Sequence, residues 1–325
     1  MNINKSNNKK YCFIGYGSIA KKHIKIINQI SKNNEIYILK KTYKKNDIDK
    51  NNVLIIKFED LIKIKIDAFF ITNPSSIHYS TLQEIYKLNS NIFIEKPIFE
   101  KYYDIHKIID YQNSIKKKLK VGYMFRHDPL FLYLKKIVEG NLIGKIKLIH
   151  IYCGSNLLNW RKKQNLTKSI SLKKNLGGGV LRELSHEIDY LLWIFGDFEL
   201  IKSKLVNTRT FKNCNVEDEA NIFLSKKNND LISLINLNFH EKKTKRFCFI
   251  IGEKGEIFAD IFSRKITIVK KGKKREKKFE GIEKAYLNQM KNFLNSNFNR
   301  KNNDKIIESL NVMKYISKIE KNNEQ

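Results

Sequence analysis

The sequence predicts an α/β protein of two domains, a doubly wound parallel sheet followed by an α+β domain with an open, largely antiparallel sheet. Its 325 residues are the length of two ordinary domains. Up to about residue 123, short apolar runs alternate with helical patterns, which is typical of parallel strands joined by crossover helices. Beyond residue 129, period-2 stretches follow one another across short turns, as they do in antiparallel sheets.

The first domain is expected over residues 1–124. Its strands are expected at residues 11–14, 35–39, 53–56, 67–72, 92–95 and 119–122. Between the first two strands, Ile19, His23, Ile26, Ile27 and Ile30 recur with helical periodicity and predict a helix with one apolar stripe. Strands that alternate with such helices predict a doubly wound sheet.

The second domain is expected over residues 125–300. We expect helices at 130–139 and 183–195, and strands at 146–153, 220–224, 231–239, 246–251 and 265–269. Residues 265–278 alternate apolar and charged side chains around Gly272, which predicts a solvated hairpin. Helical segments at 282–294 and 304–320 close the chain. Residues 301–325 are expected to pack back on the first domain.

The net charge of +30 raises the question of a nucleic-acid partner. Only 8 of the 63 basic residues are Arg, although the planar Arg fork is the group that best reads bases and phosphates. The lysines are spread through every segment, and Asn and Ile are abundant as well, which is the pattern of AT-rich codons. We therefore expect no nucleic-acid partner, and a polyanion-binding protein is the least favoured alternative.

Membrane and metal sites are not expected either. No apolar run approaches the ~20 residues that a membrane helix needs. The first ten residues lack the apolar segment of a secretory signal, so a cytoplasmic protein is expected. The four cysteines are widely separated without CxxC spacing, which predicts free thiols and no metal.

A glycine-rich turn follows the first predicted strand and opens the first helix. The first glycine permits a tight turn, the second lets the backbone approach a pyrophosphate, and the small sixth residue lets the helix pack closely on the strand. In this context the motif predicts a dinucleotide site and a Rossmann domain. Its residues are Gly15, Tyr16, Gly17, Ser18, Ile19 and Ala20.

Two lysines stand where the second strand ends. An acidic residue usually occupies this place and binds the ribose 2′-hydroxyl, but here the sequence has Lys40 and Lys41. Cations suit a 2′-phosphate, so the cofactor is expected to be NAD(P) with a preference for NADP. The alternative is that both lysines are simply solvated.

Two further segments follow strands at the same edge of the sheet, where open α/β sheets bind ligands. The first is Thr72-Asn73-Pro74, with His78 shortly after it at the start of a helix. For His78, capping or bracing of the loop is favoured over catalysis. The second is Glu95-Lys96-Pro97, in which the lysine is expected to face the crevice and the proline to fix the local backbone, with either a trans or a cis Lys96–Pro97 bond.

The second domain carries its own chemical motif. Gly177, Gly178 and Gly179 stand together in a chain with only 14 glycines, which indicates a backbone that bends sharply or approaches another group closely.

In the helix expected after them, Glu183, His186 and Asp189 recur at a spacing of three and would share one face. Carboxylates one turn on either side of an imidazole can orient it for acid/base catalysis. The alternative is a surface histidine in an ordinary helix.

Taken together, these motifs resemble the Gfo/Idh/MocA family of NAD(P)-dependent oxidoreductases, which act chiefly on sugars and polyols. The resemblance covers nearly the whole chain and rests on GYGSIA, TNPSSIH, IFIEKP, VGYMFRHDP, NW-R, LGGGVLRELSHEIDYLLWIFG, VEDEA and IIGEKGEIFAD. It implies that Lys96 and His186 are the catalytic pair and that Asp189 is the acid after the histidine. Many members have an aspartate four residues before the histidine, where this chain has Arg182. Either the turn is one residue shorter here, or Glu183, three residues before the histidine, takes over that catalytic role.

The resemblance also implies which residues bind ligands. Those expected at the cofactor are Gly15, Tyr16, Gly17, Ser18, Ile19, Lys40, Lys41, Thr72, Asn73, Pro74, His78, Glu95 and Lys96. Those expected at the substrate are Tyr123, Arg126, Trp160, Arg161 and His186.

The function expected from the sequence is hydride transfer between a nicotinamide cofactor and a sugar, sugar acid or nucleotide sugar. The sequence of residues 177–191 resembles that of family members associated with bacterial surface-polysaccharide biosynthesis. A homo-oligomer, either dimer or tetramer, is expected through the C-terminal sheet. A non-catalytic sugar or cofactor sensor on the same fold is the alternative, because function belongs to the site and not to the fold.

Overall fold

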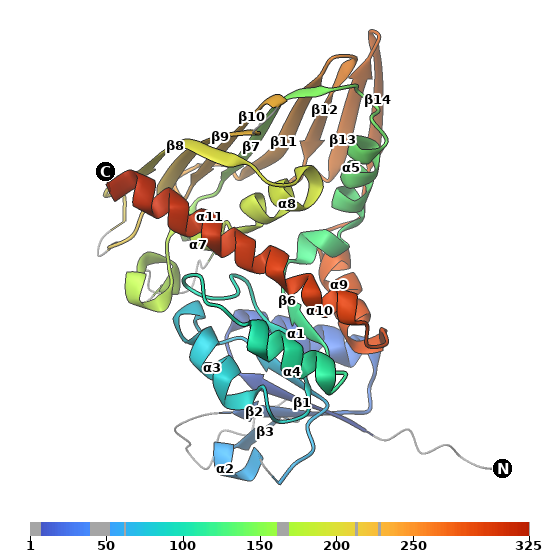
Figure 1. Cartoon of the computed structure of the whole chain (residues 1–325), viewed down its shortest axis with the longest axis vertical. Coiled ribbons are helices and arrows are strands. Elements are labelled where there is room, and N and C mark those ends of the chain that lie inside the picture. Colours follow the sequence, from blue (N-terminus) through green and yellow to red (C-terminus); the bar gives the residue numbers. More distant parts are fainter. Residues whose placement is uncertain are drawn as a thin grey trace, which may run out of the picture. The chain divides into compact units, whose positions relative to one another are not determined.

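The structure is a computed structural model that describes residues 8–39, 53–61, 63–160, 169–211, 214–226 and 229–324 (Figure 1). The chain divides into two compact units. Unit 1 comprises Met1–Phe99, Tyr103–Gly122 and Tyr286–Ile307, and unit 2 comprises Glu100–Tyr102, Tyr123–Ala285 and Glu308–Gln325. In the described part of the chain, no helix is both long enough and apolar enough to cross a membrane.

Unit 1 is built on a parallel sheet with the strand order β3-β2-β1-β4-β5-β6. Its strands are β1 (Lys9–Ile14), β2 (Asn34–Leu39), β3 (Val53–Ile56), β4 (Ala68–Ile71), β5 (Asn91–Ile94) and β6 (Leu119–Val121). Its helices are α1 (Ser18–Ile30), α2 (Phe58–Leu61), the 3-10 turn η1 (Ser75–Ile77), α3 (His78–Ile85), α4 (His106–Ser114), most of α9 (Glu283–Asn295) and α10 (Arg300–Asp304). The expected doubly wound parallel sheet is therefore confirmed.

Aromatic side chains form much of the core of unit 1. Phe13 stacks on Phe70 with ring centroids 4.5 Å apart. Phe293 of α9 lies edge-on against Phe70 and Phe93, at 5.5 Å and 5.3 Å. A buried Phe of this kind typically stabilises a fold by 3–5 kcal/mol relative to Ala. Packing of α9 on this sheet explains why residues 286–307 belong to unit 1, although they are distant in sequence from its other strands.

Unit 2 contains an eight-stranded sheet with the order β14-β13-β12-β11-β7-β10-β9-β8. Its strands are β7 (Ile146–Gly154), β8 (Glu199–Val206), β9 (Glu219–Lys226), β10 (Asn229–Asn238), β11 (Lys245–Gly252), β12 (Gly255–Asp260), β13 (Lys265–Lys270) and β14 (Lys273–Lys278). Its helices are η2 (Met124–His127), α5 (Pro129–Glu139), α6 (Leu157–Trp160), η4 (Ile170–Leu172), η5 (Lys174–Leu176), α7 (Val180–Glu183), α8 (His186–Phe195) and α11 (Ile306–Glu324). Among the described strands of this sheet, only β7 and β10 pair in parallel, so the largely antiparallel sheet is confirmed.

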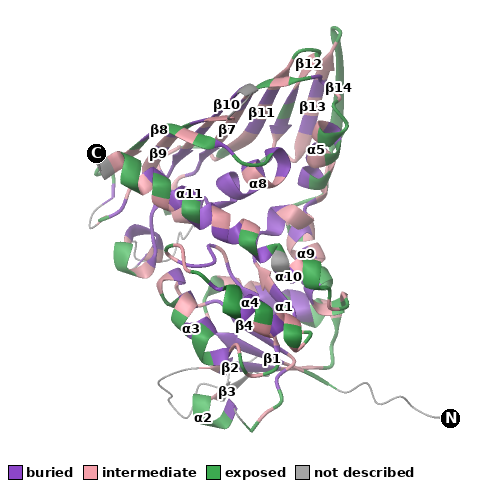
Figure 2. Cartoon of the chain, viewed as in Figure 1, coloured by how far each residue is buried: buried purple, intermediate pink, exposed green. Residues whose placement is uncertain are grey.

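Helix α8 is almost entirely buried in unit 2 (Figure 2). Its apolar residues Ile188, Leu191 and Ile194 are buried, as the apolar pattern of the sequence suggests. Its polar residues Glu187 and Asp189 are buried as well, which requires charged partners because an unpaired buried carboxylate is very costly.

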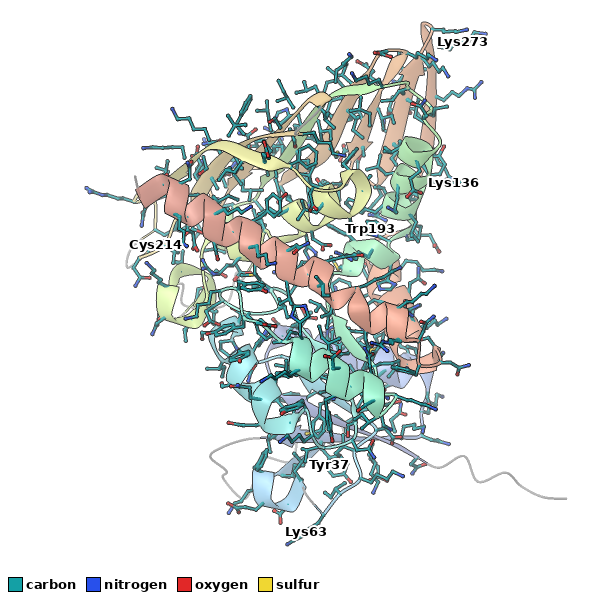
Figure 3. All side chains as sticks on the ribbon, in the orientation of Figure 1. Tyr37, Lys63, Lys136, Trp193, Cys214 and Lys273 are labelled. Carbon is teal, nitrogen blue, oxygen red and sulfur yellow. The ribbon has the colours of Figure 1, made fainter. Side chains whose placement is uncertain are left out.

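The predicted hairpin is present as β13 and β14, joined through Lys271 and Gly272. All six residues of β14 are exposed, and Lys273 lies at the tip, where its side chain points away from the sheet (Figure 3). Charged side chains on an edge strand oppose pairing with another sheet, so this strand is protected from edge-to-edge association.

One expectation about the helices is wrong. The helix expected at 183–195 is instead two helices, α7 and α8, separated at Leu184 and Ser185. Leu184 ends α7 with φ −103° and ψ 27°, outside the α-helical range, so Glu183 does not continue one helical face with His186.

The C-terminal residues divide between the two units. Residues 301–307 belong to unit 1, and residues 308–325 belong to unit 2. The edge strand β8 explains this, because its backbone amides need acceptors. Ser203 N donates to Asn322 Oδ1 at 2.9 Å, and Leu205 N donates to Asn323 Oδ1 at 2.7 Å. The last turn of α11 therefore satisfies the free edge of the sheet.

Candidate functional site

The carboxyl ends of β1, β4, β5 and β6 meet at one edge of the parallel sheet. Thr72 N donates to Ile14 O at 2.9 Å, and Glu95 N donates to Ile71 O at 2.9 Å. Gly122 N continues this edge by donating to the carbonyl at the end of β5. The residues that follow these strands are therefore held side by side, although they are far apart in sequence.

The two glycines of the predicted dinucleotide turn differ in what surrounds them. Gly15 has φ +100°, and a Cβ atom there would lie 2.6 Å from Asn73 N, so only glycine fits. Gly17 directly precedes α1, and a Cβ atom there would meet nothing within 4 Å. No side chain caps the first turn of α1. Open space at Gly17 and the N–H groups of this turn fit a pyrophosphate.

Other residues predicted to bind the cofactor lie in or beside this turn. Ser18 is exposed, Ile19 is half-buried, and Lys21 Nζ lies 4.8 Å from the centre of the Tyr16 ring. Thr72 Oγ1 donates to Gly15 O at 2.8 Å, which ties the loop after β4 to the glycine turn.

The loop after Thr72 is braced from within. Asn73 Nδ2 donates to Thr81 Oγ1 at 2.9 Å, and the loop continues through Pro74 into η1. His78 begins α3 and is buried, with ring nitrogens close to the carbonyl oxygens of Asn73, Pro97 and Ile98. The pKa of His78 is lowered, chiefly by burial, although these carbonyls act in the opposite direction.

Lys96 follows β5 and is half-buried. Its backbone N donates to Glu95 Oε2 at 3.1 Å, and the Lys96–Pro97 peptide bond is cis. The carboxylate of Glu95 is turned into the unit, where Glu95 Oε1 lies 2.6 Å from His23 Nε2. Neither Glu95 nor His78 is exposed, so their side chains contact the protein rather than solvent.

In unit 2, His186 is the first residue of α8 and is buried. Its ring lies 4.8 Å from that of Phe125 and 5.7 Å from that of Tyr123, which is edge-on to it. The triple glycine precedes this helix, and a Cβ atom at Gly178 would collide with Ile170 O. The glycines therefore allow η4 to lie directly against the segment that leads to His186.

The acid after the histidine is held by an arginine. Asp189 is fully buried, and its Oδ1 lies 2.6 Å from Arg126 Nη2. Arg126 also pairs with Glu308 of α11. Burial raises the pKa of Asp189, and the Arg126 guanidinium lowers it. The pair fixes α8 against η2 and α11 inside unit 2.

Arg182 and Glu183 point to different partners. Glu183 accepts a hydrogen bond from Ser171 Oγ at 2.5 Å. Arg182 Nη1 lies 2.6 Å from Glu320 Oε1 of α11, and Arg182 Nε donates to Glu100 O. The side chains of Arg182 and Glu183 are therefore both bound to partners within unit 2.

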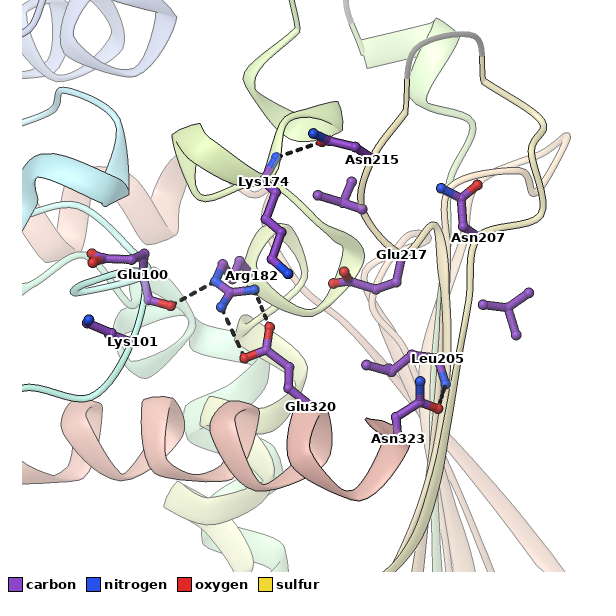
Figure 4. A pocket seen from close by; sticks show the side chains of 12 residues that line it. Glu100, Lys101, Lys174, Arg182, Leu205, Asn207, Asn215, Glu217, Glu320 and Asn323 are labelled. Atoms are coloured by element: carbon purple, nitrogen blue, oxygen red, sulfur yellow. Dashed lines mark hydrogen bonds and ion pairs between the residues drawn. The ribbon is translucent and has the colours of Figure 1, made fainter. Parts of the chain in front are cut away.

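Arg182 lines a pocket of about 630 Å³ in unit 2 (Figure 4). Lys174 and Glu217 line the same pocket. Burial raises the pKa of Glu217, although the Leu181 amide and Arg182 oppose this shift. The residues lining the pocket include neither Lys96 nor His186.

Some predicted site residues are not placed. Lys40, Lys41 and Arg161 lie outside the described residues. Trp160 ends α6. The sequence analysis assigned no role to His23, the partner of Glu95. The available signal was its position, because His23 is a polar residue within the apolar stripe of α1. A fully buried histidine needs a hydrogen-bond partner.

Comparison with known families agrees with this geometry. The profile described as "Oxidoreductase family, NAD-binding Rossmann fold" matches residues 9–123. The profile described as "GFO/IDH/MocA C-terminal domain" matches residues 131–258. The chain belongs to the GFO/IDH/MocA family of oxidoreductases. The resemblance read from the motifs is therefore confirmed at the level of the family.

Individual relatives are distant. An oxidoreductase of Formosa agariphila is 25% identical over 217 residues, which cover 64% of this chain and 63% of that protein. The chain thus spans less than two thirds of the length of this relative.

Two solved structures share the fold over nearly the whole chain. An inositol dehydrogenase homologue from Azotobacter vinelandii, complexed with NAD⁺, has a TM-score of 0.80 and 11% identity over 98% of this chain and 96% of that chain. The WlbA dehydrogenase of Bordetella pertussis, in complex with NADH and UDP-GlcNAcA, has a TM-score of 0.74 and 17% identity over 98% and 97%.

The contrast between the two glycines gives a testable prediction. Gly17→Val should lower the free energy of unfolding by no more than ~1 kcal/mol, because the new side chain has room and Val is only a poorer helix N-cap. It should nevertheless abolish binding of NADH, because the side chain fills the space where the backbone meets the pyrophosphate. NADH titration followed by nicotinamide fluorescence measures this loss.

Gly15→Val is the matched control for folding. Its φ of +100° and its close approach to Asn73 should cost more than ~2 kcal/mol of stability. If Gly17→Val binds NADH as tightly as the parent protein, the turn does not hold a dinucleotide.

Proposed function

We propose that this chain catalyses the NAD(P)-dependent interconversion of a hydroxyl and a carbonyl group on a sugar, a sugar acid or a nucleotide sugar. The observation that carries the proposal is the carboxyl edge of the parallel sheet, where the open turn at Gly17 and the lysine after β5 belong to one unit. Residues 1–124 would hold the dinucleotide, and the C-terminal unit would hold the substrate.

The residues around the glycine turn fit a dinucleotide. Gly17 and the first turn of α1 would bind the pyrophosphate, and the loop from Thr72 to Pro74 would contact the cofactor at the same edge. When bound, the cofactor supplies the redox chemistry, and the protein contributes orientation and electrostatics.

Lys96 and His186 would divide the remaining work. During oxidation His186 takes the proton of the substrate hydroxyl, and Lys96 donates a hydrogen bond to the same oxygen and stabilises its developing negative charge. Reduction uses the same groups in reverse. His186 suits this task because α8, which begins with it, is fixed by the buried pair of Asp189 and Arg126.

The substrate class follows from the family and from the motif around His186. Residues 177–191 resemble those of members associated with surface-polysaccharide biosynthesis, and the WlbA dehydrogenase structure contains a nucleotide sugar. We infer that this chain acts in the synthesis of surface carbohydrate.

We further propose that the protein self-associates through the C-terminal sheet. Helix α8 packs on one face of this sheet, whereas Phe223 and Phe258 are 37% and 38% exposed on alternate positions of β9 and β12. Tyr152 and Phe247 stack beside them on β7 and β11 with ring centroids 5.3 Å apart. Large aromatic side chains on an open sheet face are typical of a surface that a second subunit covers.

The cofactor preference is a separate prediction. Lys40 and Lys41 follow β2, where they can pair with a 2′-phosphate, so NADPH should bind at least as tightly as NADH. Replacing both lysines by Ala should weaken NADPH binding and leave NADH binding unchanged. Titration of the two cofactors against parent and variant measures this difference. A parent protein that prefers NADH would show that these lysines do not read the phosphate.

The catalytic pair gives the next prediction. Lys96→Ala and His186→Ala should each lower kcat by ~10² to 10⁴-fold, the usual contribution of a general acid or base. Cofactor affinity should change less, particularly for His186→Ala. A panel of sugars, sugar acids and nucleotide sugars must first identify a substrate that is turned over.

The pH profile of kcat/KM for oxidation adds a second readout. It should show a base titrating in the free enzyme, and that limb should disappear in His186→Ala. His106→Ala is the control, because this histidine lies on α4 with its side chain 58% exposed and should keep parental kcat. More than about a third of parental kcat in His186→Ala would show that His186 is structural.

A further inference from the structure

The backbone that carries Lys96 is contacted by two buried histidines from different helices. His23 of α1 is fully buried, and its Nε2 lies 2.6 Å from Glu95 Oε1. His78 of α3 is buried too, and its Nδ1 lies 3.1 Å from both Pro97 O and Ile98 O. His23 therefore contacts the residue before Lys96, and His78 contacts the two residues after it.

The contact of His23 reaches the Lys96 backbone through a carboxylate. A carboxylate accepts hydrogen bonds and donates none when ionised, so His23 Nε2 supplies the hydrogen. The other carboxylate oxygen, Glu95 Oε2, accepts from Lys96 N at 3.1 Å. A hydrogen-bond chain thus runs from α1 through Glu95 to the Lys96 amide.

The carboxylate of Glu95 has little room to move. A Cβ atom at Gly122 would lie 2.9 Å from Glu95 Oε1, so the end of β6 packs directly against the carboxylate. The His23 ring packs edge-on to Phe93 at 5.3 Å. Because both side chains are closely packed, the geometry of the His23–Glu95 hydrogen bond has little freedom to change.

His78 lies between two loops at the carboxyl edge of the sheet. Its Nε2 lies 2.8 Å from Asn73 O in the loop after β4, while its Nδ1 faces the carbonyls of Pro97 and Ile98. Carbonyl oxygens only accept, so the imidazole is the donor: a neutral ring donates from one nitrogen, and only the imidazolium donates from both. Burial lowers the pKa of His78 and so favours the neutral ring, which lies between the loop that follows Thr72 and the loop that follows Lys96 and donates to one of them at a time.

We propose that His23 and His78 are positioning residues, which hold the backbone of residues 95–98 and thereby set where the Lys96 ammonium lies. The inference rests on the role of Lys96 in the proposed function. A lysine side chain is long and flexible, so the direction in which its backbone leaves the strand limits the volume that its ammonium can reach. Displacement of a catalytic group by about 1 Å can cost ~10²-fold in rate.

The test compares Met and Gln at each position, because the two side chains have similar length and flexibility and differ in the amide donor. His23→Met and His78→Met should lower kcat by ~10- to 100-fold and leave KM for the substrate and the affinity for cofactor within about threefold. His23→Gln and His78→Gln should recover most of the loss. A histidine that only stabilised the fold would give no such rescue and no separation of kcat from KM.

Hydrogen exchange supplies a readout that needs no substrate. The Lys96 amide should exchange at least ~10-fold faster in His23→Met, because it loses an ordered acceptor, while the amides of β5 keep parental protection. His106→Gln, an exposed histidine of the same unit, should change neither exchange nor kcat. If the Met variants do not fold, the isosteric Glu95→Gln variant should shift exchange and kcat in the same direction.

The outcomes separate this inference from the proposed function. Parental kcat in Lys96→Ala would overturn the role of Lys96 and, with it, this inference. Loss of activity in Lys96→Ala together with parental kcat and parental Lys96 exchange in the Met or Glu95→Gln variants would overturn the positioning role alone.

Discussion

The carboxylate of Glu95 is the contact on which the arrangement of the carboxyl sheet edge depends. It accepts from His23 of α1 and from the Lys96 amide, and it packs against Gly122 at the end of β6. Helix α1, which starts at the glycine turn, and strand β5, which Lys96 follows, are therefore joined by one buried group. Because buried polar groups must find partners, none of these elements can shift without leaving a donor or an acceptor unsatisfied.

In unit 2, buried charged groups also have partners. The carboxylates of Glu187 and Asp189 on α8 are both buried, and each is matched by an arginine, Arg246 and Arg126 respectively. Removing one partner of such a pair leaves an uncompensated buried charge, which typically costs 3–5 kcal/mol. The helix that begins at His186 is thus held by pairs whose geometry allows little rotation, as the proposed role of His186 as a general base would require.

Local patterns predicted the features that depend on neighbouring residues. The strands of unit 1 follow from their apolar runs. The turn at Gly15 and the hairpin at Gly272 follow from glycine, because both positions have a positive φ that other residues rarely adopt. The break at Leu184 was missed because the apolar pattern continues across it. Strand β8 was missed because it has no alternation of buried apolar residues: Ser203 is its one buried residue. Its edge is satisfied by Asn322 and Asn323, a contact between distant segments. Side-chain partners such as Arg126 for Asp189 could not be predicted either, because tertiary packing selects them.

The central claim is that Lys96 and His186 serve one substrate oxygen. A double-mutant cycle on kcat with Lys96→Ala and His186→Ala tests it most directly. Groups that act on one oxygen are not independent, so the double variant should lose clearly less activity than the product of the two single losses. A double variant whose loss equals that product, within about a factor of two, would contradict the claim, because it would show two residues acting independently of each other.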